Sequence, residues 1–216
     1  MLSTNGTFLH VGCGSKHKDQ TPFAHTDWQE TRLDVNPDVQ PDLVGSMTDL
    51  SAVADASMDA VYSSHNIEHL YAHEVGAALA EFRRVLKPSG FLLLTCPDLR
   101  SIARMIADDK LVHAAYQSSM GPITPFDMLF GHRASIAAGN TYMAHRSGFT
   151  ANVLLATLKD IGFAQIALRE RPESFDLWAL ATMQEWPQDE LVAAANQLIP
   201  TDADATTTDV SPEAVT

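Results

Sequence analysis

Short apolar runs alternate with helix-like patterns along most of the chain, and this alternation predicts repeated βα units. Five of these runs, rich in Leu, Val or Phe, predict strands at 7–11, 31–35, 42–44, 60–63 and 91–96. Two later runs, 163–168 and 175–183, flank a polar stretch that suits a longer hairpin turn, so we expect them to pair antiparallel. The pattern predicts an α/β fold with a doubly wound, mostly parallel sheet of seven strands, the last of them antiparallel.

Two segments have the apolar spacing of amphipathic helices. In the first, 73–86, apolar residues recur every three or four positions, and the following Pro88 and Gly90 predict its end. The second begins after Thr150, a residue type that often precedes the first turn of a helix, and closes at Gly162. Both helices should bury one face against the sheet.

The pattern divides the chain into one main unit and two C-terminal pieces. We predict a domain at 1–186, a helix at 187–199, and a disordered acidic tail at 200–216, where too few apolar residues are present to form a core. Within the domain, 98–149 fits neither the strand nor the helix pattern well, because Gly and Pro break its helical pieces. We interpret 98–149 as a helical insertion that forms a lid.

Charge and hydropathy exclude several classes of partner. The formal net charge is −13, whereas proteins that bind nucleic acids usually carry a basic stripe. No apolar run approaches the roughly 20 residues of a membrane helix, and the first residues lack the pattern of a signal peptide. Cys13 and Cys96 have no Cys-x-x-Cys spacing, so neither a disulfide framework nor a zinc ribbon is indicated. We therefore expect a cytoplasmic protein that binds neither nucleic acid nor a membrane.

A pair of glycines follows the first predicted strand, where the sequence Gly-Cys-Gly occupies 12–14. Glycine has no Cβ and tolerates positive φ, so peptide N–H groups there can approach a nucleotide-like ligand closely. Asp34 lies 20 residues after Gly14, at the end of the second strand, where a carboxylate can accept hydrogen bonds from two ribose hydroxyls. A dinucleotide fingerprint needs a third glycine where His17 stands, which disfavours a dehydrogenase.

Further landmarks extend this pattern over most of the chain. They follow the predicted strands in order: 8–15 at the first, Asp34 at the second, Asp49 after the third, 63–70 after the fourth, and 82–91 leading into the fifth. Together they resemble the class I S-adenosylmethionine-dependent methyltransferases, and more narrowly the small stand-alone bacterial members of the type 11 group, over roughly 7–183. The resemblance implies a Rossmann-like fold, S-adenosylmethionine as cofactor, and O- or N-methylation of a small molecule such as a sugar or another metabolite.

The resemblance assigns cofactor binding to residues at the ends of the first four strands: Gly12, Cys13, Gly14, Asp34, Asp49, Ser64 and His65. The bare backbone of the two glycines would lie against the methionine part and ribose of the cofactor, with Cys13 passive. Asp34 would hold the ribose hydroxyls; its alternative is an ordinary turn residue before Asn36-Pro37. Asp49 would receive the adenine amino group; its alternative is a helix cap.

The lid at 98–149 contains the candidate residues for the acceptor. His132 and His145 are candidate general bases, which a hydroxyl acceptor would need, and the alternative for both is a surface or packing histidine. Arg133 and Arg146 follow them directly and would suit an anionic or hydroxyl-rich acceptor; their alternative is a salt bridge within the protein.

The chain also departs from the family pattern near its first strand. The stretch between Gly14 and Thr31 is short and polar, so we expect the first crossover helix to be truncated. His10 stands where the family often has an acidic residue. These departures leave open an alternative function, a catalytically inactive interaction module that keeps the fold.

A third hypothesis comes from the sequence His65-Asn66-Ile67-Glu68-His69, which matches the His-x-x-Glu-His pattern of inverted zinc metallopeptidases. That motif requires a long helix, whereas the match begins directly after a predicted strand. We therefore prefer the interpretation that Glu68 and His69 cap or orient the next helix, and we predict no bound metal. A zinc hydrolase using His65, Glu68 and His69 is the less favoured alternative.

Overall fold

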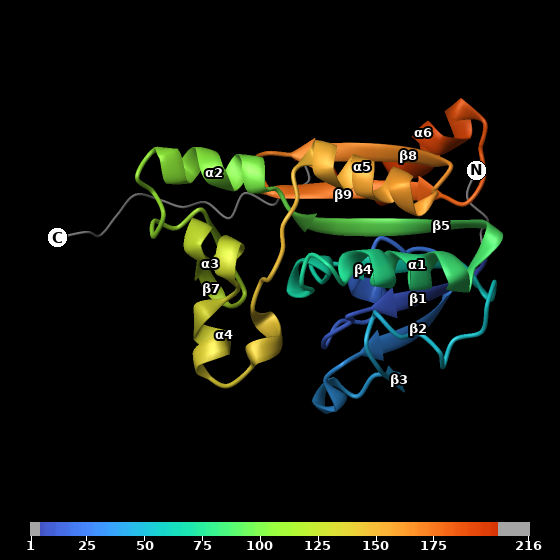
Figure 1. Ribbon diagram of the computed structural model, residues 1–216, viewed down its shortest axis with the longest axis horizontal. Helices are drawn as coiled ribbons and strands as arrows, with labels where there is room; N and C mark the ends of the chain where they lie inside the picture. The colour runs from blue at the N-terminus through green and yellow to red at the C-terminus, as the bar shows by residue number, and fades with distance from the viewer. Residues whose placement is uncertain (1–4, 203–216) are drawn as a thin grey trace.

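The computed structural model describes residues 5–202, so the predicted tail lies almost entirely outside the described residues. Seven strands form one sheet in the order β3-β2-β1-β4-β5-β9-β8 (Figure 1). Their bounds are β1 Thr7–Val11, β2 Gln29–Asp34, β3 Leu43–Val44, β4 Met58–Ser64, β5 Leu86–Pro97, β8 Gln165–Arg171 and β9 Asp176–Thr182.

The strand directions confirm the predicted fold class. The pairs β1–β2, β1–β4, β2–β3 and β4–β5 are parallel, and only β9 runs antiparallel to its neighbours, β5 and β8. Several predicted boundaries differ from the structure, and the largest difference is at β5, which begins at Leu86 and not at Phe91, because Leu86 already pairs with Met58 across a register shift. The helix before it therefore ends at Val85.

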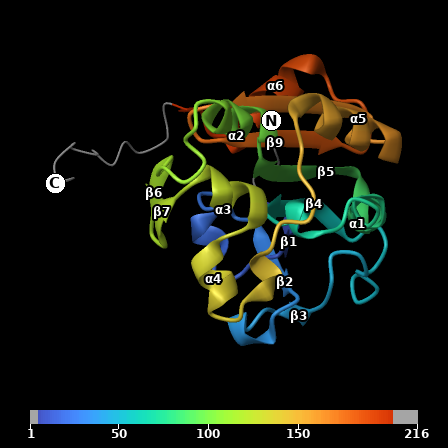
Figure 2. The same cartoon turned by 60° about the vertical axis from the view of Figure 1, so that its left-hand side comes forward.

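Helices cover the sheet on both faces, as Figures 1 and 2 show. α1 (Val75–Val85) and α5 (Ala151–Ile161) bury Phe82 and Leu158 against one face, together with Leu94 of β5. α6 (Gln188–Leu198) packs on the other face. There Leu93, which precedes Leu94 in β5, belongs to a second hydrophobic cluster. This alternation of side chains along β5 is the period of two that a strand imposes, and it fixes the register of the central sheet.

Aromatic side chains take the place of the first crossover helix. Between β1 and β2 the chain forms only a 3-10 helix, η1 (Lys18–Gln20), which confirms the expectation of a truncated crossover. Phe23 stacks on Phe8 with 4.3 Å between ring centroids, and Trp28 lies 5.1 Å from Phe23. These rings are fully or nearly fully buried, so they cover this part of the sheet without a helix.

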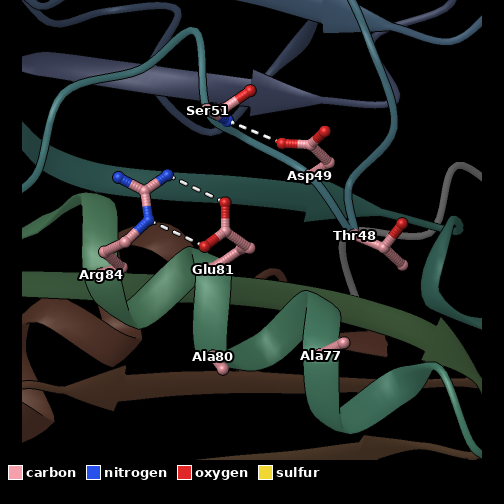
Figure 3. A pocket seen from close by; sticks show the side chains of 7 residues that line it. All are labelled: Thr48, Asp49, Ser51, Ala77, Ala80, Glu81 and Arg84. Carbon is pink, nitrogen blue, oxygen red and sulfur yellow. Dashed lines mark hydrogen bonds and ion pairs between the residues drawn. The ribbon is translucent and has the colours of Figure 1, made fainter.

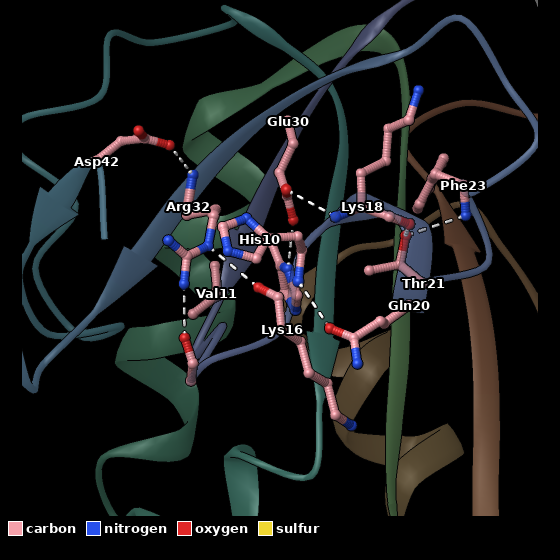
Figure 4. Close-up of polar contacts among 12 residues, drawn as sticks. His10, Val11, Lys16, Lys18, Gln20, Thr21, Phe23, Glu30, Arg32 and Asp42 are labelled. Atoms are coloured by element: carbon pink, nitrogen blue, oxygen red, sulfur yellow. Dashed lines mark hydrogen bonds and ion pairs between the residues drawn. The ribbon is translucent and has the colours of Figure 1, made fainter. Parts of the chain in front are cut away.

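Side chains from β2 hold the same loop in place (Figure 4). The buried Arg32 donates from Nη2 to the carbonyl oxygen of Gly14 at 2.7 Å and from Nε to that of Lys16 at 3.1 Å. Glu30 accepts from the backbone N–H of Lys18 at 2.8 Å and lies 2.6 Å from Nδ1 of His10. The glycine loop is therefore fastened to the neighbouring strand by charged hydrogen bonds.

We expect Arg32→Met to lower the free energy of unfolding by about 1–2 kcal/mol, because backbone carbonyl groups of the flanking loops lose their charged donor. Arg32 also donates to the carbonyl oxygens of Val39 and Gln40, so both flanking loops lose partners. Urea denaturation measures the change, and Arg104→Met, at an exposed position of α2, is the matched control. Equal unfolding free energies for the two variants would contradict the role assigned to Arg32.

The lid segment, 98–149, combines short helices with a small hairpin that the sequence did not predict. Its elements are α2 (Leu99–Ala107), β6 (Tyr116–Ser118), β7 (Gly121–Ile123), α3 (Pro125–Phe130), α4 (Arg133–Ala137) and the 3-10 helix η4 (Thr141–Met143). Figures 1 and 2 show α2, α3 and α4 at the end of the sheet to which the parallel strands point. The boundaries assigned to the domain, lid and tail stay predictions.

Two further 3-10 helices, η2 (Pro37–Val39) and η3 (Ile67–His69), follow β2 and β4 at this same end. Ligands of open α/β sheets bind outside the carboxyl ends of the strands, so this end is where the candidate site lies. Among the described residues, no helix is long and apolar enough to cross a membrane.

Candidate active site

Gly14 and Asp34 are in direct contact at the carboxyl ends of β1 and β2. The backbone N–H of Gly14 donates to Oδ2 of Asp34 at 2.8 Å, and the N–H of Asn36 donates to Oδ1 at 2.8 Å. Gly14 has a φ of +52°, and a Cβ added to it would meet no heavy atom within 4 Å. The loop therefore presents bare peptide and a nearly buried carboxylate, side by side, to open space.

Gly12 has a different role from Gly14. Its φ is +63°, but a Cβ there would lie 2.1 Å from Oδ1 of Asn66. The amide of Asn66 donates to the carbonyl oxygens of Val11 and Ser64, both at 2.9 Å, and so ties the end of β1 to the end of β4. The sequence interpretation missed Asn66. Cys13, next to this contact, is buried, and burial raises the pKa of its thiol to about 11, which suits the passive role predicted for it.

Asp49 lies in a separate surface pocket. Its Oδ1 accepts from the N–H of Ser51 at 3.1 Å within a turn, and no helix begins there. The pocket, about 570 Å³ in volume, lies between this turn and α1 and is crossed by the ion pair of Glu81 with Arg84 (Figure 3). Gly14 and Asp34 are not among the residues that line it, so the structure does not join Asp49 to them in one pocket. Its predicted contact with adenine stays a prediction.

Glu68 is the most unusual side chain at this end of the sheet. It is 1% exposed, and neither of its carboxylate oxygens has a hydrogen-bond partner among the described residues. Its Oε1 lies 3.6 Å from Nδ1 of His65 and 4.0 Å from Nε2 of His145. Burial disfavours the charged form of Glu68, but the neighbouring His65, whose own pKa is raised, outweighs burial and lowers the pKa of Glu68, so the group is a carboxylate.

Two sequence interpretations of this segment do not hold. Glu68 and His69 lie in η3 and cap no helix: the cap position of α1 is Glu74, five residues after His69. The cap interpretation is therefore wrong, because the extra turn between η3 and α1 separates them. The three residues of η3 are also too short for the long helix that the zinc metallopeptidase motif requires.

His145 reaches this cluster from the lid. Its Nδ1 lies 2.8 Å from the carbonyl oxygen of Met128, which makes Nδ1 the protonated nitrogen and leaves a lone pair on Nε2 facing Glu68. Burial lowers the pKa of His145, so the ring is neutral near pH 7. The rings of His145 and His69 are 4.9 Å apart between centroids. The fold thus gathers lid and core residues that are distant in sequence.

Comparison with known proteins shows a likeness to methyltransferases. Residues 9–94 match the family model described as a methyltransferase domain, a segment that contains Gly14, Asp34 and Glu68. The strand order places the single antiparallel strand, β9, between β5 and β8. Over 9–94 the chain resembles a methyltransferase domain, and its fold agrees with that of the class I methyltransferases. The methyl donor and cofactor of this family is S-adenosylmethionine.

Solved structures agree with this fold at low sequence identity. A protein from Pyrococcus horikoshii OT3 is 16% identical, with a TM-score of 0.58 and 82% of each chain covered. The 1,6-didemethyltoxoflavin-N1-methyltransferase of Burkholderia thailandensis, solved with its substrate and S-adenosylhomocysteine, is 15% identical, with a TM-score of 0.53 over 84% of this chain and 72% of that one. The methyltransferase domain structure of citrinin polyketide synthase is 11% identical, with a TM-score of 0.54; the match covers 84% of this chain but 47% of that one. A search of curated protein sequences found no match.

The residues at the strand ends fit an adenosyl group. Each oxygen of Asp34 accepts one backbone N–H, and a carboxylate oxygen has a second lone-pair site, so both keep capacity for a ribose hydroxyl. The open space in front of Gly14 leaves room for a ligand against its backbone. Ser64 and His65 end β4 at the same edge, and His65 holds a positive φ of +52° that is uncommon for a residue with a side chain.

The lid places its other candidates in different surroundings. Arg133 donates from Nε to Oδ1 of Asp127 at 2.8 Å, which is the salt bridge weighed as its alternative, and its side chain is 49% exposed. His132 lies 2.8 Å from Oγ of Ser135 through Nδ1. Arg146 instead lies over the ring of Tyr71, with its backbone N–H on the carbonyl oxygen of Glu68 at 2.8 Å. Of the four, His145 and Arg146 therefore adjoin the core site.

Proposed function

We propose that this methyltransferase methylates a small-molecule acceptor at oxygen or nitrogen, with a sugar or another hydroxyl-rich metabolite as the class to test first. The observation that carries the cofactor site is the contact of Gly14 with Asp34 at the ends of β1 and β2. A small acceptor is supported by the solved Burkholderia thailandensis enzyme, whose structure contains a small heterocyclic substrate. The net charge of −13 gives no support for a nucleic-acid acceptor.

The strand ends would hold the cofactor and the lid would hold the acceptor. Asp34 would bind the ribose hydroxyls, and the backbone of Gly14 would lie against the ligand, with Ser64 and His65 at the rim and Asp49 towards adenine. When bound, S-adenosylmethionine supplies a methyl group that its sulfonium already makes electrophilic. The protein therefore contributes mainly by orientation, which is worth up to about 7–11 kcal/mol of a barrier.

His145 is the stronger of the two candidate bases. Its neutral ring has a free lone pair on Nε2, so it can accept the proton that a hydroxyl acceptor loses. His132 is the second candidate and lies at the start of α4. Arg146 would bind an anionic or hydroxyl-rich part of the acceptor, and Arg133 could do so with the N–H groups that its salt bridge leaves exposed. A cytoplasmic location stays a prediction.

Two measurements test this function. Isothermal titration calorimetry should detect binding of S-adenosylmethionine and S-adenosylhomocysteine by the purified protein. A screen of metabolite pools should then release S-adenosylhomocysteine with at least one pool. Absence of binding to both ligands would contradict the enzyme assignment at its first step. Binding without turnover on any pool would favour the alternative, an inactive interaction module.

A further inference from the structure

A carboxylate that is buried without hydrogen bonds is a candidate ligand for a cation. Glu68 is 1% exposed, and both of its oxygens lack hydrogen bonds among the described residues. Burying an unpaired charge costs several kcal/mol, and native proteins pair such charges or bind them to metals. Nδ1 of His65 and Nε2 of His145 lie 3.6 Å and 4.0 Å from Oε1 of Glu68, and both distances are longer than a hydrogen bond.

The groups around Glu68 are metal ligands in type and arrangement. One ligand atom each of Glu68, His69 and His145 can be chosen so that all lie within 4.8 Å of one another. The second ring nitrogen of a histidine ligand usually donates to a carbonyl oxygen, which fixes the ring and its tautomer. His145 has this arrangement through Met128, and both ring nitrogens of His69 lie near carbonyl oxygens, those of His65 and Ala144.

We propose that Glu68, His69 and His145 bind one divalent first-row transition metal ion. Two imidazoles and one carboxylate suit Zn²⁺ and its neighbours better than Mg²⁺, which prefers oxygen ligands and retained water. The ligand atoms of a tetrahedral zinc site are about 3.3 Å apart, so the gap of 4.0 Å between Nε2 of His145 and Oε1 of Glu68 would close slightly. His69 would give up one of its two carbonyl contacts to bind the ion. His145 would bind the ion through Nε2 and could then not act as the general base, a role that would fall to His132.

This site differs from the zinc motif considered in the sequence. The third ligand is His145 of the lid, and His65, whose side chain is 48% exposed, is not required. It also replaces the expectation of no bound metal. Three protein ligands leave a fourth position for water or for an oxygen of the acceptor, which is the arrangement of catalytic metal sites. That consequence for the acceptor rests on the proposed function, whereas metal binding itself does not.

The ion would join the lid to the core. His145 belongs to the lid, and Glu68 and His69 follow β4, so one ion would bridge two parts of the chain. These parts already meet through hydrogen bonds, among them those from the backbone N–H groups of Arg146 and Ser147 to the carbonyl oxygen of Glu68. We therefore expect metal binding to raise the melting temperature of the protein, because an ion that binds only the folded state stabilises it.

The test uses tag-free protein treated with a chelator and then dialysed. Zn²⁺ is titrated by calorimetry and Co²⁺ by visible absorption, with Mg²⁺ as a comparison, and S-adenosylhomocysteine binding is measured in parallel. We expect one equivalent of Zn²⁺ or Co²⁺ to bind, and Glu68→Gln and His145→Ala each to weaken its affinity at least about tenfold. His113→Ala, at an exposed histidine of the lid, is the matched control and should bind as the wild type does.

Two results would overturn the site: no stoichiometric binding by the wild type, or equal affinity in the wild type and both ligand variants. Because His145→Ala changes only the lid, it keeps the test decisive if Glu68→Gln does not fold, which circular dichroism shows. Normal S-adenosylhomocysteine binding without metal binding would reject this inference and leave the proposed function standing. Metal binding without S-adenosylhomocysteine binding would support this inference and contradict the proposed function.

Discussion

Asp34→Ala should weaken the binding of S-adenosylhomocysteine by at least about tenfold, because a hydrogen bond to a charged group is worth about 1.5–3 kcal/mol and two ribose hydroxyls would lose their acceptor. The variant also frees the backbone N–H groups of Gly14 and Asn36, which the carboxylate now holds at 2.8 Å each. Calorimetry measures the dissociation constant directly. Asp34→Asn should lose affinity too, because its amide cannot accept both N–H groups.

The matched control for this experiment is Asp38→Ala, an exposed aspartate of the same β2–β3 connection. It removes an identical charge a few residues away without touching the glycine loop, so its affinity should equal that of the wild type. If Asp38→Ala loses as much affinity as Asp34→Ala, the loss results from the change in net charge, and the predicted contact between Asp34 and the ribose is wrong. If neither loses affinity, the cofactor is held elsewhere.

Gly131→Ala should reduce the rate of methyl transfer by about 100-fold while S-adenosylhomocysteine binding stays unchanged, since displacing an acceptor-positioning group by about 1 Å costs this much. Gly131 ends α3 with a φ of +94° and a ψ of 159°, a conformation that is almost exclusive to glycine. A Cβ there would lie 1.9 Å from the carbonyl oxygen of Met143, two residues before His145. The substitution must therefore displace the backbone that positions His145.

Gly139→Ala is the matched control for Gly131→Ala. Gly139 belongs to the same lid and has a similar φ of +97°, but a Cβ there would meet no heavy atom within 4 Å. Both substitutions therefore strain the backbone, and only one displaces a neighbour. The assay is release of S-adenosylhomocysteine with the acceptor pool found by screening. Equal rates for the two variants would show that the contact between Gly131 and Met143 does not position His145.

The sheet was predictable from the sequence because its signals are local. Runs such as Phe91–Cys96 are buried on both sides and are bounded by turn residues, so their type follows from a few consecutive positions. The boundaries were less predictable: β5 starts at Leu86 because of a pairing with Met58, a partner that lies far away in the sequence. The hairpin β6–β7 was missed for a related reason, since its strands are only three residues long each.

The candidate site was predictable only in part. Gly14 and Asp34 could be joined in advance, because both follow strands whose carboxyl ends meet at one edge. The meeting of Glu68 with His145 depends on how the lid folds back, and no local pattern encodes that contact. A signal was nevertheless present in the His-x-x-Glu-His spacing of 65–69, which places an acidic residue between two histidines. Asn66 gave no such signal, because its role depends on the absence of a side chain at Gly12.

The way in which β2 fastens the glycine loop affects how quickly a ligand can bind. Arg32 and Glu30 lie in a strand between β1 and β3, so the loop that they hold shares the order of the sheet. The binding site for a nucleoside would then be formed before the ligand arrives, so little conformational entropy would be lost on binding. Association should therefore be limited by encounter, not by rearrangement of the glycine loop.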